Sequence, residues 1–218
     1  MSLYSQRFHL FVVLTLVVLL DPSQSANAWT AASDWVQSPG ARVRIIAANI
    51  ESNGGIDSIV AGVQLQLDKG WKTYWRTPGD AGGIPPELDW DQSDNMTVAQ
   101  ILYPAPHRLE SSIGTSIGYS DEVVFPLQIK LKDPAKPALL RINVLFGICK
   151  DICVPVESEL ALKLVDQPGA EAGISAKLIS NLKRVPHKIK FGADASPTVK
   201  SVSAKLTGSA PEIIIDAR

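Results

Sequence analysis

The sequence predicts a mainly β protein whose central part folds as an antiparallel β-sandwich. From Gly40 to Leu164, about eight short runs of alternating apolar and polar residues follow one another, and turn-forming residues separate them at even spacing. Over the same stretch no segment repeats its apolar residues at the spacing of an amphipathic helix. We expect a short helix and a partial second β segment only after residue 165.

The first 28 residues have the features of a secretory signal peptide. Arg7 precedes the apolar run FVVLTLVVLL, and the tripeptide ANA at residues 26–28 supplies a cleavage site. The apolar run is too short for a membrane-spanning helix, which needs about 20 residues. We therefore expect cleavage after Ala28 and export to a bacterial periplasm, a compartment in which disulfides form. An uncleaved membrane anchor is the alternative.

The charge balance disfavours some classes of partner. The 218 residues carry 21 Lys or Arg and 22 Asp or Glu, a net charge of −1, and the basic residues are scattered along the chain. Nothing in this balance indicates nucleic acid or an anionic membrane surface as a partner. The about 190 residues after the signal peptide allow one large domain, or one domain and part of another.

The first two strands are expected in ARVRIIAANI and IVAGVQLQL, with the turn ESNGG between them. The segment GWKTYWRTPGDAGGIPPELDW at residues 70–90 follows, with a short strand expected in WKTYW and an irregular loop in TPGDAGGIPP. We expect Trp71, Tyr74 and Trp75 to pack in the core or at its edge. An aromatic wall beside the two cysteines is the alternative.

Four further strands are expected in the rest of the sandwich. MTVAQILYPAP at 96–106 is a strand stopped by prolines, and the polar, Gly- and Ser-rich segment 107–122 is expected to be a loop. EVVFPLQIKLK at 122–132 is the next strand, with the turn DPAKP after it. LLRINVLF at 139–146 and VPVESELALKL at 154–164 are expected to form a hairpin.

The pattern changes after residue 165. DQPGAEAG at 166–173 reads as a linker, and ISAKLISNLKRV at 174–185 places five apolar residues at helical spacing before Pro186 ends the helix. Strand character returns towards the apolar run at 213–215. The expected units are therefore the signal peptide (1–28), the sandwich (29–165), and a linker, helix and start of a possible second β domain (166–218). We expect that removing the last unit leaves thermal stability nearly unchanged.

The only two cysteines, Cys149 and Cys153, lie between the two runs of the expected hairpin. A turn or a helical turn would each bring their Cα atoms within the ~4.4–6.8 Å that a disulfide needs. A bridge would close a ring of about five residues and stabilise the fold by roughly 2 kcal/mol, against about 4.7 kcal/mol for a 100-residue loop. This weak restraint favours a redox pair, while a hairpin staple and metal ligation remain open.

Other patterns give little indication of chemistry. The sequence contains no P-loop, no GxGxxG and no HExxH motif. His107 and His187 lie in Pro-flanked polar segments and are expected to be solvated. The cysteines together with Met96 or a histidine could hold Cu(I), because soft thiolates select that ion, but two ligands at this spacing are a weak signal. We therefore predict no cofactor and no metal.

At GWKTYWRTPGDAGGIPPELDW, YPAPHR, IGYSDEVVFPLQI and GICKDICVP the sequence resembles the amino-terminal periplasmic domain of the thiol:disulfide interchange protein DsbD, and more closely the related domains of ScsB-type proteins. The resemblance covers residues 35–165. It implies an immunoglobulin-like sandwich with Cys149 and Cys153 as a redox-active, catalytic disulfide pair. The pair would receive electrons from a membrane-embedded DsbD-like or ScsB-like donor and reduce periplasmic thioredoxin-fold proteins, which would make the protein a protein-disulfide reductase.

The chain departs from this family pattern in three ways. Three residues separate its cysteines, fewer than in DsbD. The stretch that corresponds to the aromatic cap loop of DsbD, residues 110–119, offers Ile113 and Tyr119 but no Phe. The membrane and thioredoxin-like domains of DsbD have no counterpart here, so a separate protein is expected to supply electrons. A non-catalytic binding module with a structural disulfide and a copper-handling protein of the ScsB type are the alternative functions.

Overall fold

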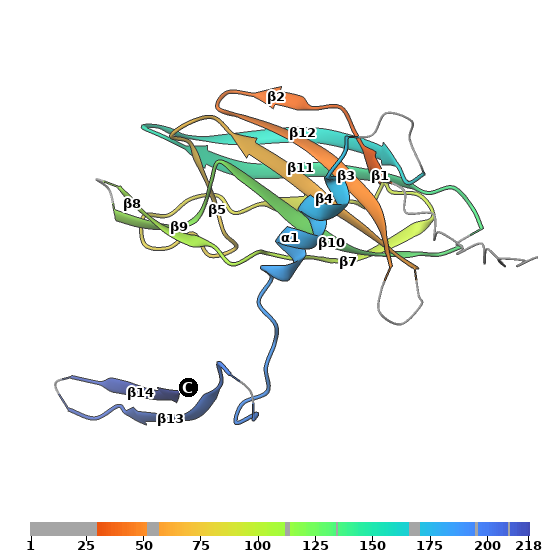
Figure 1. Ribbon diagram of the computed structural model, residues 1–218. Coiled ribbons are helices and arrows are strands. Elements are labelled where there is room, and N and C mark those ends of the chain that lie inside the picture. Colours follow the sequence, from red (N-terminus) through yellow and green to blue (C-terminus); the bar gives the residue numbers. More distant parts are fainter. Residues whose placement is uncertain are drawn as a thin grey trace, which may run out of the picture.

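Fourteen strands and one helix make up the part of the chain that the computed structural model describes, which is residues 30–51, 57–111, 114–133, 135–165, 171–194, 196–208 and 210–218. Twelve of the strands form two antiparallel sheets packed face to face, and the last two form a separate hairpin (Figure 1). The prediction of a mainly β antiparallel sandwich is confirmed. The expected signal peptide lies outside the described residues.

The first sheet has six strands in the order β1-β3-β4-β10-β7, with β2 paired to β3. Its strands are β1 (Thr30–Ala32), β2 (Val36–Ser38), β3 (Ala41–Glu51), β4 (Asp57–Leu67), β7 (Met96–Ile101) and β10 (Glu122–Leu131). Strands β3 and β4 are the two that the sequence predicted first, and they pair along their whole length. In β4 the alternation of VQLQL buries Val63 and Leu65 in the core between the sheets.

The second sheet has six strands in the order β12-β11-β5-β9-β8, with β6 paired to β11. Its strands are β5 (Lys72–Tyr74), β6 (Glu87–Asp89), β8 (His107–Ser111), β9 (Gly114–Ser120), β11 (Leu139–Cys149) and β12 (Cys153–Lys163). The even-numbered residues of β11 from Leu140 to Ile148 are buried in the core. Because side chains alternate along a strand, the odd-numbered residues, Cys149 included, face outward.

The expectation of a loop at residues 107–122 is wrong, because most of this segment forms the antiparallel hairpin β8–β9. Strand β9 also pairs with β5 on its other edge, so tertiary pairing overrides a composition typical of loops. Gly118 permits the close approach of these strands, since a Cβ atom there would lie 2.0 Å from the Thr73 carbonyl oxygen. Ser116, Gly118 and Ser120 thus belong to a strand and not to a loop.

Helix α1 (Ile174–Lys183) lies on the outer face of the first sheet, where Figure 1 shows it in front of β3, β4 and β10. Ile174 and Leu178 pack against Ile46, Ala48 and Val124. The predicted helix is confirmed to within two residues at its end. Because α1 buries apolar side chains against the first sheet, we now expect removal of all residues after 165 to lower thermal stability, in place of the expectation from the sequence alone.

Strands β13 (Val199–Lys205) and β14 (Glu212–Ala217) form the C-terminal hairpin, which stands apart from the sandwich in Figure 1. Most of its apolar side chains are exposed, including Val202 and the three isoleucines of β14. No helix among the described residues is long and apolar enough to cross a membrane.

Candidate redox site

Cys149 and Cys153 are joined by a disulfide at the end of the β11–β12 hairpin. Their sulfur atoms are 2.04 Å apart and their Cα atoms 4.0 Å apart. Cys149 ends β11, Cys153 begins β12, and the two are direct cross-strand partners. Residues 150–152 make the turn, in which the Lys150 N–H donates to the Ile152 carbonyl over 3.3 Å. The predicted hairpin with both thiols at the base of its turn is confirmed.

The two halves of the disulfide differ in exposure. Cys149 is only 2% exposed, because β5 pairs alongside it with Lys72 as its cross-strand neighbour. Cys153 begins the edge strand β12 and is exposed. A thiolate arriving from solvent can therefore reach Cys153, whereas Cys149 is buried.

Tyr74 provides the polar contact to the disulfide. Its hydroxyl group lies 3.3 Å from the Cys153 sulfur and acts as the donor, since a bridged sulfur carries no hydrogen. The Tyr74 side chain is 2% exposed, and this burial raises the pKa of its hydroxyl above the ordinary value of 10.0. The hydroxyl therefore keeps its proton at neutral pH and remains available as a donor.

The aromatic residues near the cysteines divide between two roles. Trp71 and Trp75 are partly buried and pack against the main core, as expected. Tyr74 instead lies beside the sulfurs. For this residue the structure supports the alternative expectation, an aromatic side chain next to the cysteines. Tyr74 is the last residue of β5, inside the run WKTYW that the sequence predicted as a strand.

Of the two proposed cap residues, Tyr119 is the one that the structure describes, and it does not lie over the sulfurs. Tyr119 sits in the core, where its ring contacts Phe125 edge to face and its hydroxyl donates to the Pro104 carbonyl over 2.7 Å. Burial raises the pKa of this hydroxyl. Because Tyr119 faces inward and the disulfide faces outward, its position does not fit a capping role. Ile113 lies outside the described residues.

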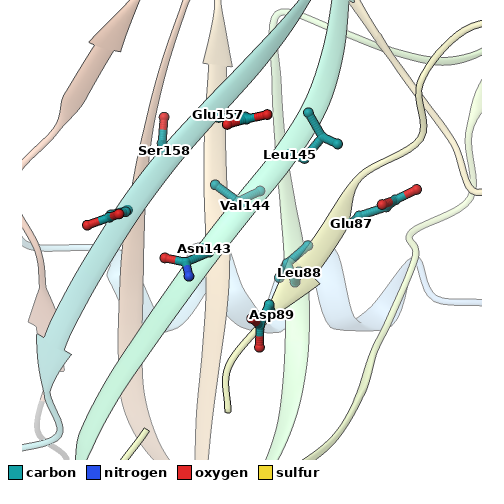
Figure 2. A pocket seen from close by; sticks show the side chains of 9 residues that line it. Glu87, Leu88, Asp89, Asn143, Val144, Leu145, Glu157 and Ser158 are labelled. Carbon is teal, nitrogen blue, oxygen red and sulfur yellow. The ribbon is translucent and has the colours of Figure 1, made fainter. Parts of the chain in front are cut away.

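A groove of about 580 Å³ continues the outward face of the sheet beyond the disulfide (Figure 2). Its lining side chains come from β6, β11 and β12, with Glu87, Leu145 and Glu157 in one cross-strand row. Asp89, Asn143 and Glu159 form the next row. Leu145 precedes Cys149 by four residues on β11, which corresponds to about 13 Å along a strand. The groove is therefore acidic, and it lies on the same face of the sheet as the disulfide without including either cysteine.

The described residues offer little for a metal ion. They contain no group of three or more His, Cys, Asp and Glu side chains with a geometry that could hold one. Both thiols are used in the disulfide, and His107 and His187 are exposed.

Fold and site together define a β-sandwich domain that carries a half-exposed disulfide at the tip of one hairpin. The family model described as "Thiol:disulfide interchange protein DsbD, N-terminal" matches residues 47–164, more than half of the chain. The protein therefore belongs to the family of DsbD N-terminal domains, as the sequence motifs indicated.

A solved structure supports the same assignment. The N-terminal periplasmic domain of ScsB from Proteus mirabilis has 27% sequence identity to this chain and a TM-score of 0.57. The match covers 80% of this chain and 64% of that one, so the chain spans less than two thirds of the length of the ScsB domain. A comparison with curated proteins finds no match.

Proposed function

We propose that this protein is a periplasmic thiol–disulfide exchange protein that relays electrons through Cys149 and Cys153 to or from thioredoxin-fold partners. The observation that carries the proposal is a disulfide between near neighbours with one half exposed. A bridge across so short a loop restrains the unfolded chain weakly, by roughly 2 kcal/mol. Exchange explains such a bond better than stabilisation does.

The difference in exposure supports a distinct role for each cysteine. In the reduced protein, the Cys153 thiolate attacks a sulfur of the partner's disulfide, and the partner's other sulfur leaves as a thiolate. The Cys149 thiolate then attacks the Cys153 sulfur, which forms the internal disulfide and releases the partner's second thiolate. Two electrons pass to the partner, whose two thiolates take up protons from water. The same steps in reverse reduce this protein at the expense of a dithiol donor.

Tyr74 supports the exposed thiolate. A hydroxyl that donates to the bridged sulfur is already placed to donate to the Cys153 thiolate after reduction. Hydrogen bonds to a charged acceptor are about twice as strong as neutral ones, so this contact lowers the pKa of the thiol. A larger fraction of Cys153 is then ionised at neutral pH.

The periplasmic location rests on two supports. The N-terminal residues 1–28 have a signal-peptide pattern, and the solved relative is a periplasmic domain. The expected partners are periplasmic thioredoxin-fold proteins together with a membrane-embedded DsbD-like or ScsB-like electron donor, in keeping with the family to which the chain belongs. The sandwich strands carry the site, and we propose that helix α1 belongs to the same packed unit.

Trapping of mixed disulfides tests the assignment. Cys149→Ser leaves the exposed Cys153 without its resolving thiol, so this variant should accumulate a mixed disulfide with a periplasmic thioredoxin-fold protein. Cys153→Ser is the matched control, because it leaves only the buried Cys149, and it should trap far less. Equal trapping by both variants would contradict the assigned roles, and trapping by neither would support a binding module with a structural disulfide.

A further inference from the structure

An irregular segment, residues 77–86, lies between β5 and β6 and is called the strap below. Lys72 of β5 is the cross-strand partner of the outward-facing Cys149, so its side chain also faces outward. Because side chains alternate along a strand, Tyr74, two residues further on, points to the same outer face. A side chain on an outer sheet face is ordinarily accessible, yet Tyr74 is only 2% exposed. The strap accounts for this, because Gly83 lies directly against the Tyr74 ring.

The strap is fixed to the second sheet at both ends. At its start, the Ile117 N–H donates to the Pro78 carbonyl over 2.7 Å, and the Ala81 N–H donates to the Thr115 carbonyl over 3.3 Å. At its end, the Gly147 N–H donates to the Ile84 carbonyl over 3.0 Å. The Tyr103 hydroxyl also donates to the Pro86 carbonyl over 3.0 Å. The strap therefore bridges β9 and β11 across the ring.

Gly83 is the point of closest packing. Its φ is +143°, and a Cβ atom built on it would lie 2.4 Å from Cε1 and 2.5 Å from Cζ of Tyr74. No ring can accept such a contact, so any larger residue at position 83 must displace either the ring or the strap. The neighbouring Gly82 also has a positive φ, +69°, but a Cβ atom there would meet nothing within 4 Å.

We propose that the strap positions the Tyr74 hydroxyl at Cys153 and that Gly83 is the positioning residue through which it does so. This inference rests on the proposed function, since a fixed hydroxyl matters for exchange only if Cys153 exchanges. A donor held in place needs no reorganisation when the thiolate forms, and small displacements of such a donor weaken its effect. Gly83 thus controls the ionisation of Cys153 without touching it.

The test measures the pKa of the Cys153 thiol from the pH dependence of its alkylation rate, in the Cys149→Ser background. Tyr74→Phe should raise this pKa and reduce the thiolate fraction at neutral pH by about tenfold. Gly83→Ala should shift the pKa in the same direction by a similar amount. Gly82→Ala is the matched control, because it introduces the same side chain at a positive φ without meeting the ring, and it should leave the pKa unchanged.

A double-variant cycle separates positioning from general damage. If Gly83 acts through Tyr74, then Gly83→Ala should add nothing to Tyr74→Phe. Additive effects, or a Gly83→Ala protein that matches Gly82→Ala, would overturn the proposal while leaving exchange at Cys153 intact. No effect of Tyr74→Phe in a protein that still exchanges would overturn it as well. If the unaltered protein showed no thiol–disulfide exchange at all, the proposed function itself would be refuted.

A second variant decides the matter if Gly83→Ala does not fold. Tyr103→Phe removes only the hydroxyl that holds Pro86, and so loosens one end of the strap without adding any atom. This variant should raise the pKa of the Cys153 thiol in the same direction as Tyr74→Phe, by a smaller amount. An unchanged pKa would count against positioning by the strap.

Discussion

At the residue scale, the chemistry of the site depends on the single contact between the Tyr74 hydroxyl and the Cys153 sulfur. Tyr74→Phe keeps the ring that packs under Gly83 and removes only this donor. The rate of exchange with an aromatic disulfide at neutral pH should fall by up to about tenfold, because fewer Cys153 thiols are ionised. The pH–rate profile should move to higher pH, and stopped-flow absorbance measures both effects.

Tyr74→Phe should also leave the fold in place. The net contribution of one hydrogen bond to stability is only about 0.5–1.5 kcal/mol, so the denaturation midpoint should change little. A rate and a profile identical to those of the unaltered protein would show that Tyr74 has no role beyond packing.

The sequence identified the cysteines but not their environment. Their spacing between two apolar runs predicted the hairpin, because strand alternation and turn length are local properties. The exposure difference between Cys149 and Cys153 arises from the pairing of β5 with β11, which joins residues more than 70 positions apart. The same long-range pairing brings Tyr74 to the sulfur, and no local pattern reports it.

At the element scale, helix α1 is a structural part of the sandwich. Leu178 is fully buried between the helix and the first sheet. Leu178→Ala should cost about 2–5 kcal/mol of unfolding free energy, the usual range for a buried Leu-to-Ala change. The half-buried neighbour Ile179 is the control, and Ile179→Ala should cost clearly less. Equal costs in urea denaturation would mean that α1 does not pack as described.

The segment before α1 is tied to the sheet by an ion pair between Glu171 and the buried Arg44, which also lies over the Trp35 ring at 4.2 Å. The hydrogen bond from Arg44 lowers the pKa of the Glu171 carboxyl below its ordinary value of 4.5. Because the pKa of Glu171 is lower in the folded state, its carboxylate stabilises the fold above about pH 4.5. This contribution is lost as the pH falls through the pKa of the folded state.

Replacement of this carboxylate should therefore have a pH-dependent effect. Glu171→Gln should lower stability at neutral pH by at most about 1 kcal/mol, since Glu171 is 57% exposed and its charge is screened. The difference from the unaltered protein should vanish at acid pH, where both side chains are neutral. Urea midpoints measured across this range would contradict the account if the difference were the same at every pH.

The hairpin β8–β9 shows where composition misleads. Residues 107–122 are rich in Ser and Gly, which favour loops in isolation. In the fold, β9 is held between β8 and β5, and its inward-facing Tyr119 fills the core. The three-residue strands β1, β2 and β6 were also missed, because they are too short to show an alternating pattern.

At the scale of the whole molecule, the packed unit should extend through α1 and end before β13. The residues of β13 and β14 are nearly all exposed, and a two-stranded hairpin is only marginally stable alone. A chain that ends after residue 187 should therefore keep its melting temperature to within a few degrees. A chain that ends after residue 165 also loses Ile174 and Leu178 and should melt more than ~10 °C lower.

Thermal unfolding followed by circular dichroism compares the two truncated chains with the full one. If both truncations had the same small effect, helix α1 would contribute nothing to the sandwich. If removal of β13 and β14 alone lowered the melting temperature by more than ~10 °C, the hairpin would belong to the same packed unit.

The central claim is that Cys149 and Cys153 form an exchangeable disulfide, and its reduction potential tests this most directly. Equilibration of the protein with glutathione buffers of known potential, followed by quantification of free thiols, gives this value. The account predicts a midpoint above about −300 mV, within reach of thioredoxin-fold partners. A midpoint below about −300 mV, where structural disulfides typically lie, would contradict it and identify the bond as a staple of the hairpin.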